Sequence, residues 1–207
     1  MRTEPRPTPP ASEWRQIGVF GGTFDPPHVG HLVAAVNVRH ALDLDVVLLV
    51  VASDPWQKSH RELTPAGDRL AMVEAAVGDV AGLEASDIEL RRPGRSYTAD
   101  TLAELHRVHP AAELLVVVGS DAAAGLPTWE RADEVRDLAA VIVVTRPGAE
   151  DGQPPAGWEW RSVETPRLEV SSTDLRARVS DGRPLDYLLT APVLESIEAR
   201  GLYRSPG

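Results

Sequence analysis

The chain has 207 residues, no cysteine, a hydrophobic content of 43% and a formal net charge of −10. This length suits one domain with a sizeable core, while the missing cysteines exclude a disulfide framework and a thiol nucleophile. Because the charge argues against a general nucleic-acid binder, and neither a membrane span nor the apolar core of a signal peptide is visible, we expect a cytoplasmic protein without nucleic-acid or membrane partners.

Apolar segments alternate with amphipathic ones after residues 1–13, a proline-rich stretch for which we expect a disordered tail before one domain over residues 14–207. The predicted strands are 17–20, 46–51, 83–90, 114–119 and 141–145, and the predicted helices are 29–42, 65–77, 98–108, 172–179 and 192–201. Valine-rich strands that alternate with helices predict an α/β fold: a single doubly wound, Rossmann-like domain with a mainly parallel sheet and a C-terminal helical segment. Ligands of such sheets bind at the carboxyl ends of the strands.

The first strand runs into the segment Gly-Gly-Thr-Phe-Asp-Pro-Pro-His-Val-Gly-His, which ends at His31. His28 and His31 stand three residues apart at a predicted helix start, where unpaired N–H groups and the helix dipole favour anions. We expect Gly21 and Gly22 to permit a tight turn, and Gly30 to let a polyphosphate approach the backbone. The segment therefore predicts a phosphate site.

Other interpretations of this segment are less well supported. Its pattern is neither the Gly-x-Gly-x-x-Gly fingerprint of dinucleotide sites nor a P-loop. A zinc site is disfavoured, because three protein ligands are usual and only Asp25 is close to the two histidines. Each histidine could instead be a helix cap or a half-buried imidazole.

Further candidates follow later strands. Lys58 follows the second strand, Asp121 lies in Gly119-Ser-Asp after the fourth, and Arg146 follows the fifth. One crevice at the edge of the sheet could collect them with His28. The alternatives are a solvated loop lysine at position 58 and a helix N-cap at position 121.

A second motif, Val-Ser-Ser-Thr-Asp-Leu-Arg, ends at Arg176 and opens a predicted helix. Ser171, Ser172 and Thr173 are residue types that cap helices and can hold anionic oxygens. Arg176 lies one turn further on and can donate two hydrogen bonds to a phosphate. The alternative is an ordinary capped helix with a solvated arginine.

Together the two motifs resemble those of the nucleotidylyltransferase superfamily, which carries His-x-Gly-His in the first strand–helix turn and Ser-Ser-Thr-x-[Ile/Leu]-Arg before a late helix. From Gln16 to Tyr203 the chain resembles the bacterial nicotinate-mononucleotide adenylyltransferases in particular, because further segments fall in family order. These segments are 21–28, Pro-x-x-Lys at 55–58, Arg-Leu-Ala-Met-Val at 69–73, Arg-Ser-Tyr-Thr-Ala-Asp-Thr-Leu at 95–102, Gly-Ser-Asp at 119–121 and Leu-Pro-Thr-Trp at 126–129.

The resemblance implies that the adenylyl group of ATP passes to nicotinate mononucleotide by direct in-line attack, with Mg²⁺ carried by ATP and no protein cage for the metal. The implied catalytic residues are His28, His31, Lys58 and Arg176. The implied ATP-binding residues are Gly21, Gly22, Thr23, Phe24, Gly30, Gly119, Asp121, Arg146, Ser171 and Ser172, and the implied nicotinate mononucleotide-binding residues are Lys58, Thr98 and Trp129.

We expect Trp129 to stack on the pyridine ring, and N–H donors near Thr98 to receive the nicotinate carboxylate, so that the acid is preferred over the amide. Three alternatives stay open: another acceptor, such as nicotinamide mononucleotide or phosphopantetheine; a fragment of a class I aminoacyl-tRNA synthetase; and a non-catalytic nucleotide sensor. The sequence indicates no oligomeric state.

Overall fold

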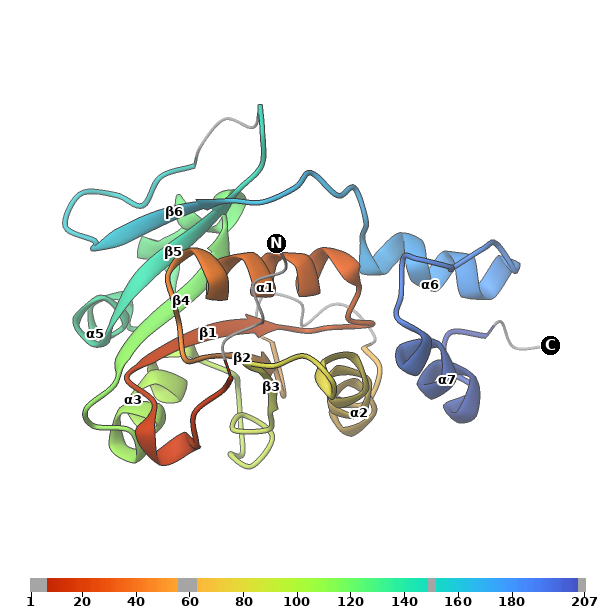
Figure 1. Cartoon of the computed structure of the whole chain (residues 1–207), viewed down its shortest axis with the longest axis horizontal. Coiled ribbons are helices and arrows are strands. Elements are labelled where there is room, and N and C mark those ends of the chain that lie inside the picture. The colour runs from red at the N-terminus through yellow and green to blue at the C-terminus, as the bar shows by residue number, and fades with distance from the viewer. Residues whose placement is uncertain (1–6, 56–62, 149–151, 205–207) are drawn as a thin grey trace.

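The computed structural model describes residues 7–55, 63–148 and 152–204, and its centre is a six-stranded sheet (Figure 1). The strands are β1 (Gln16–Gly22), β2 (Val46–Val51), β3 (Leu83–Ser86), β4 (Glu113–Gly119), β5 (Ala139–Thr145) and β6 (Trp160–Glu164). They are ordered β3-β2-β1-β4-β5-β6, and every neighbouring pair is parallel. The chain moves outward from β1 to β3 and then returns to place β4 on the other side of β1. The topological switch point, where doubly wound folds bind ligands, thus lies between β1 and β4.

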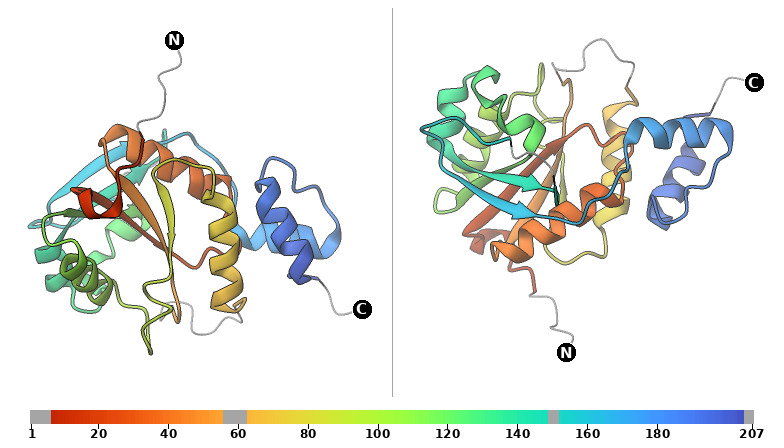
Figure 2. Two further views of the ribbon diagram at one scale, coloured as in Figure 1. Left: turned by 60° about the horizontal axis from the view of Figure 1, so that its bottom comes forward. Right: turned by 90° about the horizontal axis from the view of Figure 1, so that it is seen from above.

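Helices cover both faces of this sheet (Figure 2). They are α1 (Val29–Ala41), α2 (Ala66–Val77), α3 (Thr98–Val108), α4 (Ser120–Ala123), α5 (Ala132–Leu138), α6 (Ser172–Asp181) and α7 (Ala191–Arg200), with short 3₁₀ turns η1 (Ala11–Glu13) and η3 (Leu126–Thr128). Strand β2 is buried throughout because its successive side chains enter opposite cores. Val47 and Leu49 pack into the core that holds α1 and α2, while Val46 and Leu48 pack into the core that holds α3 and α5.

The two C-terminal helices lie beside the sheet, next to α2 (Figures 1 and 2). Val193 and Ile197 of α7 are buried in the same core as Met72 and Val73 of α2. Apolar burial of this kind contributes about 1.5–3 kcal/mol for each large side chain, so α7 is firmly attached to the domain. The α/β class, the parallel sheet and the C-terminal helical segment are confirmed.

The elements differ from the prediction in two respects. The strand predicted over 83–90 is wrong beyond Ser86, because Leu90 and Arg91 donate their N–H groups to the Asp87 carbonyl and close a turn. Strand β6, an edge strand in which only Val163 is buried, and the short helix α5 are not predicted from the sequence, whereas α4 is the short helix that the N-cap alternative for Asp121 implies. Of the predicted tail the structure describes residues 7–13, which contain η1. Within the described ranges no helix has the length and apolar character needed to cross a membrane.

Candidate functional site

The loop between β1 and α1 is shaped by Gly22 and Phe24. Strand β1 continues through Gly22, and the left-handed φ of this loop, +49°, falls on Phe24 rather than on a glycine. The expected glycine turn is therefore wrong. A Cβ at Gly22 would lie 2.8 Å from the Phe24 ring, so this glycine makes room for that ring. The buried ring of Phe24 meets His31 edge to face, with centroids 5.0 Å apart, so this side chain packs against His31.

The two histidines stack on each other at the start of α1, with ring centroids 3.7 Å apart. The His28 N–H donates to His31 Nδ1 over 3.2 Å, and the His28 carbonyl accepts from the His31 N–H over 2.9 Å. Since His31 accepts at Nδ1, its neutral ring carries the proton on Nε2. His31 can thus donate a hydrogen bond from Nε2.

His28 is neutral at physiological pH. Its side chain is buried, and this burial, aided by the positive charge of Arg146, lowers its pKa from 6.5 to about 4. A Cβ at Gly30 would lie 3.0 Å from His28 Nδ1, so the absence of a side chain at Gly30 makes room for the imidazole. Positive charge at this helix start must therefore come from other residues, such as Arg146.

The C-terminal segment also reaches this helix start. The N–H of Val29, the first residue of α1, donates to the carbonyl of Leu188 over 3.1 Å. One of the N–H groups expected to face a phosphate is therefore already paired. The start of α1 is held by a segment that lies more than 150 residues away in the chain.

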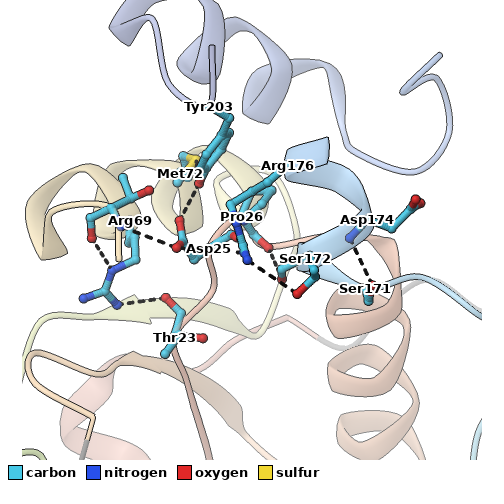
Figure 3. A network of polar contacts seen from close by, with 12 residues as sticks. Thr23, Asp25, Pro26, Arg69, Met72, Ser171, Ser172, Asp174, Arg176 and Tyr203 are labelled. Atoms are coloured by element: carbon cyan, nitrogen blue, oxygen red, sulfur yellow. Dashed lines mark hydrogen bonds and ion pairs between the residues drawn. The ribbon is translucent and has the colours of Figure 1, made fainter. Parts of the chain in front are cut away.

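The second motif contacts the first directly (Figure 3). Ser172 Oγ donates to the Pro26 carbonyl over 2.9 Å, and Arg176 Nη1 donates to the Asp25 carbonyl over 2.7 Å. Ser171 Oγ caps α6 by accepting from the Asp174 N–H. The two serine hydroxyls thus hold the loop and the helix, and their predicted contacts with phosphates remain a prediction. Arg176 still has donors to offer, because a guanidinium carries five N–H groups.

Two buried charges that the sequence analysis left without a role stabilise the same loop (Figure 3). Arg69 of α2 is 1% exposed and donates to the carbonyls of Thr23 and Thr64, each over 2.8 Å. Asp25 is 2% exposed and accepts from the Tyr203 hydroxyl over 2.6 Å. A signal for Arg69 exists in the sequence, since it falls on the buried face of a predicted amphipathic helix, where an unpaired charge is costly.

A cavity of about 290 Å³ opens at the carboxyl ends of β1, β2 and β4. Its lining includes the predicted residues Gly21, Gly22, Thr23, Thr98, Gly119 and Trp129. It also includes Glu89, which the sequence analysis missed and which accepts from Thr101 Oγ1 over 2.7 Å. The cavity wall is therefore not made of donors alone.

Asp121 and Arg146, predicted to bind ATP, are not among the residues that line the cavity. Asp121 is exposed in the first turn of α4, outside the residues that line the cavity. Arg146 follows β5, and its positive charge helps to lower the pKa of His28. Lys58 lies outside the described residues.

Comparison with known proteins places this geometry in a family. The family model described as cytidylyltransferase-like matches residues 19–178, a range that contains both motifs. A probable nicotinate-nucleotide adenylyltransferase of Saccharopolyspora erythraea is 43% identical over 194 residues, which cover 93% of this chain and 92% of the relative. Its counterpart from Streptomyces coelicolor is 44% identical over 188 residues, which cover 89% of this chain and 99% of the relative. The chain belongs to the cytidylyltransferase-like family and, within it, to the nicotinate-nucleotide adenylyltransferases.

The fold agrees with that of solved adenylyltransferases. The nicotinic acid mononucleotide adenylyltransferase of Plasmodium falciparum, solved as a complex with NaAD, superposes with a TM-score of 0.74. The alignment covers 91% of this chain and 97% of that one at 17% sequence identity. Similarity at this level of identity concerns the fold alone.

Proposed function

We propose that the protein transfers the adenylyl group of ATP to nicotinate mononucleotide and releases pyrophosphate. The observation that carries this proposal is the contact between the two motifs: Ser172 and Arg176 bond to the loop that leads into His28 and His31. This contact brings two helix starts together at the loop that follows Thr23, which lines the same cavity as Thr98 and Trp129, and this arrangement supports a phosphate site. The names of the relatives support the same reaction.

The reaction needs positioning more than acid–base chemistry. An oxygen of the mononucleotide phosphate attacks the α-phosphorus of ATP in line, a new P–O bond forms, and the bond to the departing pyrophosphate breaks. The attacking phosphate is already an anion, so no enzyme nucleophile is required. We assign His31 Nε2–H to the charge that develops on the α-phosphate, and Arg176 and Arg146 to the triphosphate oxygens. Lys58 remains a candidate for the same oxygens.

Magnesium is proposed to arrive with ATP. Mg²⁺ keeps several water ligands and is commonly bound through substrate phosphates. The arginines of the site would then neutralise the remaining phosphate charge, while the neutral His31 supplies a directional hydrogen bond. His28, also neutral, packs against His31 and fixes the plane of its ring.

The cavity suits a pyridine nucleotide. Trp129 is half-buried and offers a ring face, and Thr98 opens α3, where N–H groups and the helix dipole favour a carboxylate. The Glu89 carboxylate is engaged by Thr101, which in turn accepts from Arg92 over 3.3 Å. Because Glu89 is held in this way, the N–H donors near Thr98 can favour binding of nicotinate mononucleotide over nicotinamide mononucleotide.

Pyrophosphate release in the presence of Mg-ATP tests the proposal, with nicotinate mononucleotide, nicotinamide mononucleotide and phosphopantetheine compared as acceptors. An amide would leave a buried donor unpaired, so we expect kcat/KM for the acid to exceed that for the amide by about tenfold to a hundredfold. Parity between the two would show that Glu89 acts as an acceptor for the amide. Release with phosphopantetheine alone, or with none of the three, would reject the assigned reaction.

A further inference from the structure

Tyr203 connects the C-terminal end of the domain to the phosphate site (Figure 3). It follows α7 and lies beyond residues 19–178, the range that the family model matches. Its hydroxyl donates to Asp25 Oδ1 over 2.6 Å and lies 3.7 Å from the Met72 sulfur. Its φ of +62° is left-handed, which is uncommon for a bulky side chain and is maintained only where surrounding contacts compensate for the strain.

The Asp25 carboxylate is surrounded by donors that leave little freedom. Tyr203 occupies Oδ1, while Oδ2 accepts from the Thr64 N–H over 3.4 Å and lies 4.0 Å from Arg176 Nη1. Burial and the bond to Asp25 raise the pKa of the Tyr203 phenol, so it stays protonated and remains a donor. The guanidinium of Arg69 adds a second positive charge near the carboxylate.

Arg176 therefore lies beside the Asp25 carboxylate without a hydrogen bond to it. Its Nη1 donates to the Asp25 backbone carbonyl over 2.7 Å, whereas the distance to Oδ2 is too long for a hydrogen bond. If the carboxylate lost its bond to Tyr203 it could turn toward Arg176, because paired N–H···O bonds between a guanidinium and a carboxylate are strongly favoured. Such a pair would occupy donors that the triphosphate needs.

We propose that Tyr203 is a positioning residue for ATP: its hydroxyl holds the Asp25 carboxylate away from Arg176, which keeps the guanidinium donors available for phosphate. The proposal rests on the assigned adenylyl transfer and adds the C-terminal end of the chain to the machinery that binds ATP. A merely structural Tyr203 would affect both substrates alike, whereas a positioning role affects ATP alone.

Tyr203→Phe is the test variant, since it keeps the ring that packs near Met72 and removes only the hydroxyl. Tyr187→Phe is the matched control, because Tyr187 lies in the same C-terminal segment and is 93% exposed. We expect Tyr203→Phe to raise KM for ATP by about five- to twentyfold, since part of a charge-assisted contact is lost, and to leave KM for nicotinate mononucleotide within about twofold. Tyr187→Phe should match the wild type.

A double-mutant cycle shows whether the effect passes through Arg176. In an Arg176→Ala background, Tyr203→Phe should change KM for ATP by less than about twofold, because the residue it acts through is gone. Equal losses for both substrates, full additivity in this cycle, or an unchanged KM for ATP in the single variant would each overturn the proposal.

Calorimetric titration with α,β-methylene-ATP separates this proposal from the assigned reaction. It measures the dissociation constant without turnover, and its stoichiometry reports the fraction of folded sites. The constant therefore belongs to folded molecules even if Tyr203→Phe is less stable. A wild-type enzyme that binds the analogue but transfers no adenylyl group would reject the reaction alone, while equal affinity of wild type and Tyr203→Phe would reject the role of Tyr203 alone.

Discussion

Acidification should destabilise the folded protein through His28. In the folded state its pKa is about 4, lowered from 6.5 mainly by burial. Between these two pH values the unfolded chain binds a proton that the folded protein does not, so the free energy of unfolding decreases as the pH falls through this window. Above pH 6.5 His28 is neutral in both states, so its titration takes nothing from the free energy of unfolding. From the two pKa values, His28 costs the protein about 2 kcal/mol at pH 5 and about 3 kcal/mol at pH 4.

The perturbation that isolates this contribution is His28→Asn. Asparagine can still cap α1, but it does not titrate. Urea unfolding followed by circular dichroism at pH 7, 6, 5 and 4 gives the free energy of unfolding of each variant. The difference between wild type and His28→Asn cancels the contributions of the carboxylates and should shrink by about 2 kcal/mol from pH 7 to pH 5. The exposed residue His106 provides the control His106→Gln, which should follow the wild type. Parallel curves for wild type and His28→Asn would refute the reasoning, because they would mean that His28 binds its proton equally in both states.

Three substitutions test the assigned site. His31→Ala removes the donor to the α-phosphate and should lower kcat about a hundredfold or more with little change in the affinity for ATP; a correctly folded variant that works at the full rate would end this assignment. Arg176→Ala should raise KM for ATP about ten- to a hundredfold and weaken the binding of nicotinate mononucleotide less, which separate calorimetric titrations with the two ligands measure. Because Arg176 also bonds to the Asp25 carbonyl, Arg176→Lys and a thermal melt serve as controls for a loss of structure. Trp129→Leu should weaken the binding of nicotinate mononucleotide by about tenfold while the affinity for ATP stays constant. The reverse pattern would show that Trp129 does not belong to the acceptor pocket.

The sequence predicted the fold because its signals are local. Runs such as Val46–Val51 are apolar at every position, and the structure buries each of them between two helical layers. Strand β6 cannot be predicted from an apolar run in this way, because only one of its five residues is buried. The sequence pattern also fails as a predictor at residues 87–90, where an apolar and polar alternation continues although the chain has already turned.

The sequence predicted which segments form the candidate site but not which contacts each side chain makes there. Motif spacing located His28, His31 and Arg176, because a helix start imposes its own geometry. The pairings of Ser172 with Pro26 and of Tyr203 with Asp25 join residues more than 140 positions apart, and only the folded chain brings them together. The space beside Gly22 and Gly30 could not be predicted either, because it depends on how the rings of Phe24 and His28 are oriented in the folded loop.

The measurement that tests the central claim most directly follows the α-phosphorus. The protein is incubated with Mg²⁺, nicotinate mononucleotide and ATP labelled at the α-phosphate, and the products are separated and counted. The account predicts that the label appears in nicotinate adenine dinucleotide, with one pyrophosphate released for each dinucleotide formed. Label that stays in ATP, or that appears in free AMP, would contradict it.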